Sequence, residues 1–233
     1  MRNRRSSRRR RPLPDPRLRL VRRLAQAKQR EKLGLFVVEG EDLVYGARAA
    51  GIEPVEVLVA GEGVSPEELR SVSSLAHPPR VLAVFRRDDL RQQDPPRLGL
   101  ALWRVADPGN VGALIRTADA LGPALVALSP GCADPTGPKA VRASMGALFR
   151  VAFVDFEEAP RPWVALVPRG GDRLESLDAG SYVLGAEREG LPPDVLARCD
   201  RRATIDLAPD ADSLNVAMSG TIALYESSRG RSR

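Results

Sequence analysis

Three segments in the second half of the chain place polar residues and glycines directly after short apolar runs. In the first, Asn110 stands where it could cap a helix, and Arg116 lies six residues further on, off the apolar side of that helix. A helix that only packs against a core needs no arginine there. Arg116 is therefore a candidate for contact with a ligand or substrate.

The other two segments share this design. Residues 182–191 (YVLGAEREGL) hold Glu187 between two glycines, Gly185 and Gly190, and glycine lets a backbone approach a ligand closely. Residues 205–215 (IDLAPDADSLN) lead into the last expected helix, with Ser213 as its candidate N-cap. Because α/β proteins bind ligands at the carboxyl ends of their parallel strands, we expect the three segments to form one site.

The commonest nucleotide-binding motifs are missing from the sequence. No G-x-G-x-x-G follows a strand-like run, and residues 131–139 (GCADPTGPK) have the wrong spacing for a phosphate loop, in which Pro138 would also remove a backbone donor. The motifs H-E-x-x-H and G-x-S-x-G are missing too. The sequence therefore gives no support to a nicotinamide-type dinucleotide site, a phosphate-loop ATPase, a zincin or an α/β-hydrolase.

At these residues the chain resembles the SpoU (TrmH-type) branch of the SPOUT RNA 2′-O-ribose methyltransferases. The motif N-x-G-x-x-x-R-T-A is matched at residues 110–118, V-L-G-x-E-x-x-G-L at residues 183–191 and S-L-N-V-A at residues 213–217. Three motifs in order make the resemblance specific. A weaker similarity, at residues 36–40 (FVVEG), links the N-terminal half to the small RNA-binding domain of members that act on ribosomal RNA.

The resemblance implies a fold, a cofactor and a site. The implied fold is α/β, with a C-terminal parallel-sheet SPOUT domain that carries a deep trefoil knot, preceded by a smaller α/β RNA-binding domain. The implied cofactor is S-adenosylmethionine (S-adenosyl-L-methionine), and a homodimer is expected. Carried over by position, the cofactor-binding residues are Leu184, Gly185, Ile205, Leu207 and Leu214. The catalytic residues are Asn110, Arg116, Glu187, Ser213 and Asn215.

The implied reaction is methyl transfer to a ribose 2′-hydroxyl of structured RNA, with ribosomal RNA favoured by the extra N-terminal domain. A sulfonium methyl is already activated, so no metal is expected, and alignment of the reactants supplies roughly 7–11 kcal/mol. Arg116 is the family's usual general base, but a guanidinium stays protonated. We therefore expect Arg116 to hold the phosphate and hydroxyl and to stabilise the developing oxyanion. A structural ion pair between Arg116 and Glu187 is the alternative.

Other functions remain open from the sequence. Transfer RNA is the alternative substrate, and methylation of a base is an alternative reaction. A catalytically inactive RNA-binding protein of the same fold is the alternative in the binding class. The sequence does not reveal which nucleotide is modified.

Positive charge is concentrated at the N-terminus. Seven arginines and no acidic residue lie in the first eleven residues, and the net charge of +6 falls to −1 without them. We expect residues 1–14 to be a disordered arm that binds RNA phosphates through arginine. A solubilising tail and a transit peptide are the alternatives.

The remaining composition narrows the class of protein. Cys132 and Cys199 cannot build a disulfide framework, and His77 is the only histidine, so a metal site would need mostly carboxylates. No apolar run approaches the roughly 18–20 residues of a membrane span, and no secretory signal is present. We expect a soluble, cytoplasmic protein.

The elements that position the site follow from apolar periodicity and turn residues. For residues 15–88, the expected small domain, the pattern predicts strands at 35–39, 55–60 and 81–85 and helices at 17–32, 41–50 and from Ser65, where Glu68 completes a capping box. The polar residues 89–96 are an expected linker.

Residues 97–229 are the expected methyltransferase domain. Strands are predicted at 98–105, 124–128, 151–154, 164–167, 182–184 and 204–207, and helices at 111–121, 139–148, 194–199 and 214–227. Such alternation indicates a mainly parallel sheet covered by helices. The last helix is expected to bury Leu214, Met218, Ile222 and Tyr225.

Overall fold

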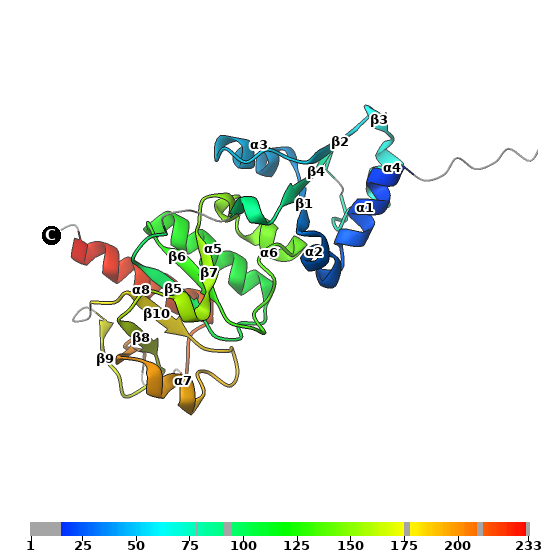
Figure 1. The fold of residues 1–233 in the computed structure, drawn as a ribbon. Coiled ribbons are helices and arrows are strands. Elements are labelled where there is room, and N and C mark those ends of the chain that lie inside the picture. Colours follow the sequence, from blue (N-terminus) through cyan, green and yellow to red (C-terminus); the bar gives the residue numbers. More distant parts are fainter. Residues whose placement is uncertain (1–14, 78, 91–94, 175–177, 209–211, 232–233) are drawn as a thin grey trace, which may run out of the picture.

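The computed structural model describes residues 15–77, 79–90, 95–174, 178–208 and 212–231, which form two sheets with their covering helices (Figure 1). The predicted arginine arm and residues 91–94 of the predicted linker lie outside the described residues. Within the described part of the chain, no helix is long and apolar enough to cross a membrane.

The N-terminal unit is built on a four-stranded sheet in the order β1-β4-β2-β3. Its β4 runs antiparallel to both β1 and β2. The elements are α1 (Pro16–Leu24), α2 (Ala27–Leu33), β1 (Leu35–Glu39), α3 (Glu41–Ala49), β2 (Glu56–Ala60), β3 (Gly63–Val64), α4 (Pro66–Arg70) and β4 (Val81–Arg86). The predicted capping box of Ser65 and Glu68 is confirmed. The prediction of one helix over 17–32 is wrong, because the chain turns between α1 and α2, where Arg30 Nη1 donates to the carbonyls of Leu24 and Ala25.

The C-terminal unit is built on a seven-stranded sheet in the order β7-β6-β5-β10-β8-β11-β9, and every strand pair in it is parallel. The strands are β5 (Gly99–Leu102), β6 (Leu125–Leu128), β7 (Phe153–Asp155), β8 (Trp163–Leu166), β9 (Asp172–Arg173), β10 (Ser181–Leu184) and β11 (Arg201–Thr204). The helices are α5 (Pro108–Leu121), α6 (Pro138–Ala143), α7 (Pro193–Arg198) and α8 (Val216–Arg231), with short 3₁₀ turns η1 (Asp88–Leu90), η2 (Ala147–Phe149) and η3 (Phe156–Glu158). The predicted α/β class with a parallel sheet is confirmed.

Three details differ from the pattern-based expectations. The last strand lies at Arg201–Thr204 and not at 204–207, because pairing with β8 and β9 sets its position. The helix expected over 139–148 ends at Ala143, since Met145 and Gly146 both have positive φ before η2 begins. Met218 and Tyr225 of α8 are 59% and 51% exposed, so the prediction that they face the core is wrong.

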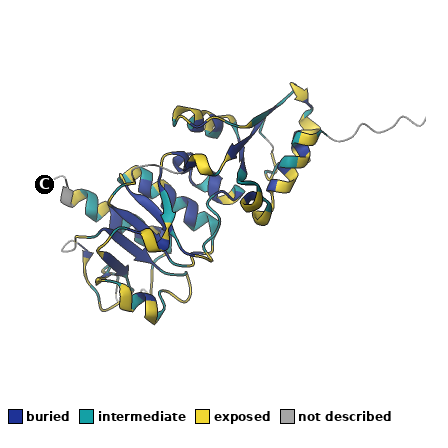
Figure 2. Cartoon of the chain, in the orientation of Figure 1, coloured by how far each residue is buried: buried dark blue, intermediate teal, exposed yellow. Residues whose placement is uncertain are grey.

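The two units share one hydrophobic core. The ring of Phe149 in η2 lies 6.4 Å from that of Phe36 in β1 and 5.5 Å from that of Phe85 in β4, measured between centroids. Leu90, inside the predicted linker, and Leu98, just after it, are buried in the same core. Figure 2 shows buried residues in both sheets and at their junction. Each buried Phe or Leu contributes about 1.5–3 kcal/mol, so this packing fixes one unit against the other.

Candidate active site

The carboxyl ends of three neighbouring strands, β8, β10 and β11, border a cavity of about 460 Å³. All five predicted cofactor-binding residues line it, namely Leu184, Gly185, Ile205, Leu207 and Leu214. So do three of the predicted catalytic residues, Glu187, Ser213 and Asn215. Segments far apart in sequence therefore meet at one edge of the sheet, as expected for parallel strands.

One wall of this cavity has no counterpart among the motifs. Leu166 ends β8, Val167 and Pro168 follow it, and Ser219 comes from the first turn of α8. The sequence offered one signal for the residues at the end of β8. A parallel strand predicted at 164–167 must end at the same edge of the sheet as the strands that precede the motifs. Ser219 follows Asn215 by one helical turn, which places the two residues on the same side of α8.

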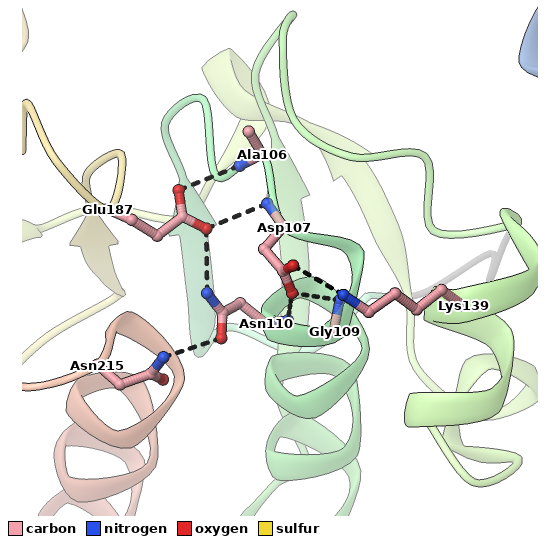
Figure 3. Close-up of polar contacts among 7 residues, drawn as sticks. All are labelled: Ala106, Asp107, Gly109, Asn110, Lys139, Glu187 and Asn215. Atoms are coloured by element: carbon pink, nitrogen blue, oxygen red, sulfur yellow. Dashed lines mark hydrogen bonds and ion pairs between the residues drawn. The ribbon is translucent and has the colours of Figure 1, made fainter.

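The side chain of Glu187 joins the three motif segments (Figure 3). Its Oε1 accepts from Asp107 N at 3.1 Å and from Asn110 Nδ2 at 3.0 Å, while Oε2 accepts from Ala106 N at 3.3 Å. Asn110 Oδ1 in turn accepts from Asn215 Nδ2 at 3.0 Å. The loop before α5, the loop after β10 and the start of α8 are thus tied by one chain of hydrogen bonds.

Asp107, and not Asn110, caps helix α5. Asp107 Oδ1 accepts from Gly109 N at 2.7 Å and from Asn110 N at 3.0 Å, and Oδ2 accepts from Lys139 Nζ at 2.8 Å. The expectation that Asn110 caps the helix is therefore wrong, because α5 begins at Pro108, one turn earlier than the apolar pattern suggested. The Asn110 amide is free to bridge Glu187 and Asn215.

Asn215 has the same capping task in α8. Its Oδ1 accepts from Ala217 N at 2.9 Å and from Met218 N at 3.4 Å. The prediction that Ser213 caps this helix is wrong, because α8 starts at Val216. Ser213 is exposed and lies in the cavity wall. Asn215 thus fixes the helix end with one side-chain atom and holds Asn110 with the other.

The environment of Glu187 keeps its carboxyl ionised. Partial burial alone would raise the pKa of Glu187, but hydrogen bonds from Asn110 and from the backbone of Asp107 and Ala106 outweigh it and hold the pKa below the ordinary value. An ionised carboxylate that already accepts three hydrogen bonds is a weak proton acceptor. Glu187 is therefore suited to positioning the loops.

Arg116 stands apart from this cluster. It lies on the exposed side of α5, six residues after Asn110, which corresponds to about 9 Å along a helix and to a different face. Among the residues that the structure describes, no hydrogen bond or ion pair joins Arg116 to Glu187, which leaves the alternative of a structural pair without support. The structure thus groups Asn110, Glu187, Ser213 and Asn215 but leaves Arg116 outside.

Two motif glycines are required by close packing. A Cβ on Gly185 would lie 2.2 Å from the carbonyl carbon of Gly190, in the loop closed by backbone hydrogen bonds between Ala186 and Gly190. A Cβ on Gly112 would lie 2.5 Å from the Cβ of Ala143, where α5 packs on α6. The close approach at Gly185 is therefore to the chain's own backbone, and the loop shape depends on it.

The fold and the candidate site together define the class of protein. A parallel sheet covered by helices, with a cavity and a polar cluster at its carboxyl edge, is a ligand-binding α/β domain. The N-terminal unit adds a second sheet fixed to it. Within the described residues, no group of three or more histidine, cysteine or carboxylate side chains could hold a metal ion.

Comparisons with known proteins identify the family. The model of the SpoU rRNA methylase family matches residues 97–225, and that of the MRM3-like substrate binding domain matches residues 15–86. The chain is 31% identical to the uncharacterized tRNA/rRNA methyltransferase slr1673 of Synechocystis, over 92% of this chain and 91% of that protein. It is 29% identical to the 23S rRNA (guanosine(2553)-2'-O)-methyltransferase RlmP of Bacillus subtilis, over 87% of this chain and 92% of that protein.

Solved structures agree with these matches. The AdoMet-bound rRNA methyltransferase from Sinorhizobium meliloti has a TM-score of 0.82 and 28% identity, over 94% of this chain and 96% of that one. The chain belongs to the SpoU rRNA methylase family. The resemblance inferred from the three motifs is thereby confirmed.

Proposed function

We propose that this protein is an S-adenosylmethionine-dependent RNA methyltransferase that methylates a ribose 2′-hydroxyl in ribosomal RNA. The observation that carries the proposal is the cavity at the carboxyl edge of the sheet, closed on one side by the Glu187–Asn110–Asn215 cluster, in a chain of the SpoU family. The names of relatives that act on 23S rRNA, and the N-terminal substrate-binding domain, favour ribosomal over transfer RNA.

The cavity fits the proposed cofactor. Its volume of about 460 Å³ lies within the range of small-molecule sites, which is about 300–1,000 Å³. Leu184, Ile205 and Leu214 offer apolar contact, while the loops after β10 and before α8 offer backbone donors and acceptors. When bound, S-adenosylmethionine supplies an activated methyl group.

The residues around the cavity have separate roles in this proposal. Glu187 fixes the loop before α5 and the first turn of that helix, which presents Asn110 at the rim. Asn110 and Asn215 orient the ribose, with Ser213 beside them in the cavity wall. Arg116 binds the phosphate and hydroxyl of the substrate and stabilises the developing oxyanion, because its guanidinium stays charged.

A homodimer explains the position of Arg116. Arg116 is exposed and lies outside the cavity of its own chain. Met218 and Tyr225 are exposed apolar residues seven positions apart, so they share one side of α8, the helix that packs on α5. We propose that the dimer interface includes this side of α8 and that Arg116 of one protomer completes the cavity of its partner.

The remaining expectations belong to the same proposal. We divide the chain into an arginine arm (1–14), an RNA-binding domain (15–88), a linker (89–96) and a knotted methyltransferase domain (97–229). Family matches over residues 15–86 and 97–225 support this division. A cytoplasmic location fits a ribosomal RNA substrate.

Methyl transfer from labelled S-adenosylmethionine to 23S rRNA transcribed in vitro tests the function. We expect label in the RNA, and nuclease digestion should place it in a 2′-O-methyl nucleoside. Label in a base would contradict the ribose assignment, and label in transfer RNA alone would contradict the ribosomal one. Cofactor binding by calorimetry without transfer to any RNA would indicate an inactive binding protein.

A further inference from the structure

Arg104 has an unusual backbone conformation two residues after β5. Its φ is +54°, a region that residues other than Gly, Asn and Asp rarely occupy. Both neighbours fix it there. Trp103 N donates to Leu184 O at 2.8 Å, and Val105 is buried, with its carbonyl accepting from Ala133 N at 2.9 Å. The chain must turn at Arg104, where glycine or asparagine would cause less strain.

The backbone of Arg104 is anchored, whereas the end of its side chain has no partner among the described residues. Arg104 N donates to Ser129 Oγ at 2.9 Å. Its stem lies across Gly131, where a Cβ would come within 3.3 Å of Arg104 Nε. Arg104 is exposed, and its guanidinium has no hydrogen bond or ion pair with any of the residues that the structure describes. A strained residue with an unpaired charge, close to an active site, suggests that the side chain has a function.

The position of Arg104 indicates which ligand it meets. The sheet order places β5 between β6 and β10, whereas the cofactor cavity lies over the ends of β10, β8 and β11. On the other side, residues of the N-terminal unit such as Gly34 and Arg87 face Leu128 of β6 and Phe153 of β7 across a cavity of about 570 Å³. Arg104 therefore lies between the N-terminal unit and the cofactor cavity.

We propose that Arg104 binds a backbone phosphate of the RNA strand next to the target nucleotide and so positions the ribose at the cavity. This inference rests on the proposed function. RNA held by the N-terminal unit must cross the end of β5 to reach Asn110, and the guanidinium fork of Arg104 matches a phosphate there. The cofactor lies on the other side of the loop, so it does not supply this anion.

Arg104→Gly separates this role from a structural one, because it relieves the backbone strain and removes the guanidinium. We expect its melting temperature to equal or exceed that of the parent and its affinity for S-adenosylmethionine to stay within twofold. KM for a 23S rRNA transcript should rise at least tenfold, and the log–log salt slope of RNA binding should fall by about 0.7–0.9, as for one lost phosphate contact. Arg104→Lys should recover only part of the affinity, since an ammonium lacks the planar fork.

Arg202→Ala is the matched control. Arg202 is exposed at the amino end of β11, on the opposite edge of the same sheet, and its loss should leave KM and the salt slope unchanged. Parent-like KM and slope in Arg104→Gly would overturn the inference, and so would equal losses in Arg202→Ala. RNA binding by filter retention is measured for each variant beside transfer. If the parent binds the transcript but methylates nothing, the proposed function fails. The binding measurements on the parent and the variants still decide whether Arg104 contacts RNA.

Discussion

Arg30 of the N-terminal unit and Asp134 of the C-terminal unit form an ion pair, with Arg30 Nε 2.8 Å from Asp134 Oδ2. The side chain of Arg30 is only 6% exposed, and its Nη1 also donates to the end of α1. Arg87 adds a second contact with Asp134 at 3.6 Å. The pair therefore fixes the basic helix α1 and the turn after it relative to the C-terminal unit, which carries the candidate active site.

Removal of Arg30 should be costly. Arg30→Ala removes one cation from the carboxylate of Asp134 and leaves the carbonyls of Leu24 and Ala25, at the end of α1, without this donor. We therefore expect a loss of about 3 kcal/mol in the free energy of unfolding, as for a broken buried pair. Urea denaturation measures it. Arg48→Ala, which breaks an exposed pair with Glu53, should cost less than about 1 kcal/mol. Similar losses of unfolding free energy in both variants would show that the Arg30 pair stabilises the fold no more than an exposed pair does.

The same pair gives stability a pH dependence. Burial alone would raise the pKa of Asp134, but hydrogen bonds from Thr136 and the charges of Arg87 and Arg30 outweigh it and lower the pKa. A lowered pKa stabilises the folded state above the unfolded value of about 3.9, and this contribution is lost as the pH falls through the folded-state value. Free energies of unfolding between pH 7 and pH 3 should therefore fall more steeply in the parent than in Asp134→Asn. Parallel curves would contradict this prediction.

Arg116 should be essential for methyl transfer and dispensable for folding. Loss of a group that stabilises a developing oxyanion costs roughly 10²–10³-fold in rate, so Arg116→Ala should lower kcat by at least about 100-fold with cofactor affinity unchanged. Arg116→Lys should also fail, because one ammonium does not reproduce a planar fork. Arg150 provides the control, because it is exposed and pairs with Asp119 of α5, the helix that also carries Arg116. Arg150→Ala should stay active. Activity of Arg116→Ala within threefold of the parent would contradict the assignment.

Gly185 should control cofactor affinity through the shape of its loop. A Cβ there would collide with the backbone of Gly190, so Gly185→Ala should displace the loop after β10 and weaken S-adenosylmethionine binding at least tenfold in calorimetry. RNA binding should change less than twofold. Gly46→Ala is the control, because Gly46 lies in α3 with open space around it. Equal losses of both ligands in Gly185→Ala would indicate misfolding instead.

The arginine arm should contribute to RNA affinity through charge. Deletion of residues 1–11 should lower the log–log salt slope by about 0.7–0.9 per lost phosphate contact, and we expect about two to four contacts to be lost. Turnover at saturating RNA should change little, because the three motifs lie elsewhere. An arm of equal length with serine for each arginine should behave like the deletion. An unchanged slope would make the arm a solubilising tail.

The sequence by itself determined the class of fold, and it predicted eight of the residues that line the candidate cavity. Apolar periodicity predicted the alternation of strands and helices, and the three segments with their family resemblance predicted the cavity-lining residues Gly185, Ile205 and Leu214. These signals are local, since each depends on a strand end and the few residues after it. Parallel pairing then brings such ends to one edge whatever the shape of the loops, which is why local sequence signals predict these residues.

Only the tertiary structure decided which side chain performs which task. Asp107 rather than Asn110 caps α5, because the helix begins at Pro108. Glu187 and Asn215, both more than seventy residues further along the chain, engage the Asn110 amide instead. Arg104 is ordinary in sequence, and its strain follows from hydrogen bonds to β10 and to the loop after β6. The ion pair of Arg30 with Asp134 spans 104 positions. Such choices depend on long-range packing and hydrogen bonding, which local propensity does not contain.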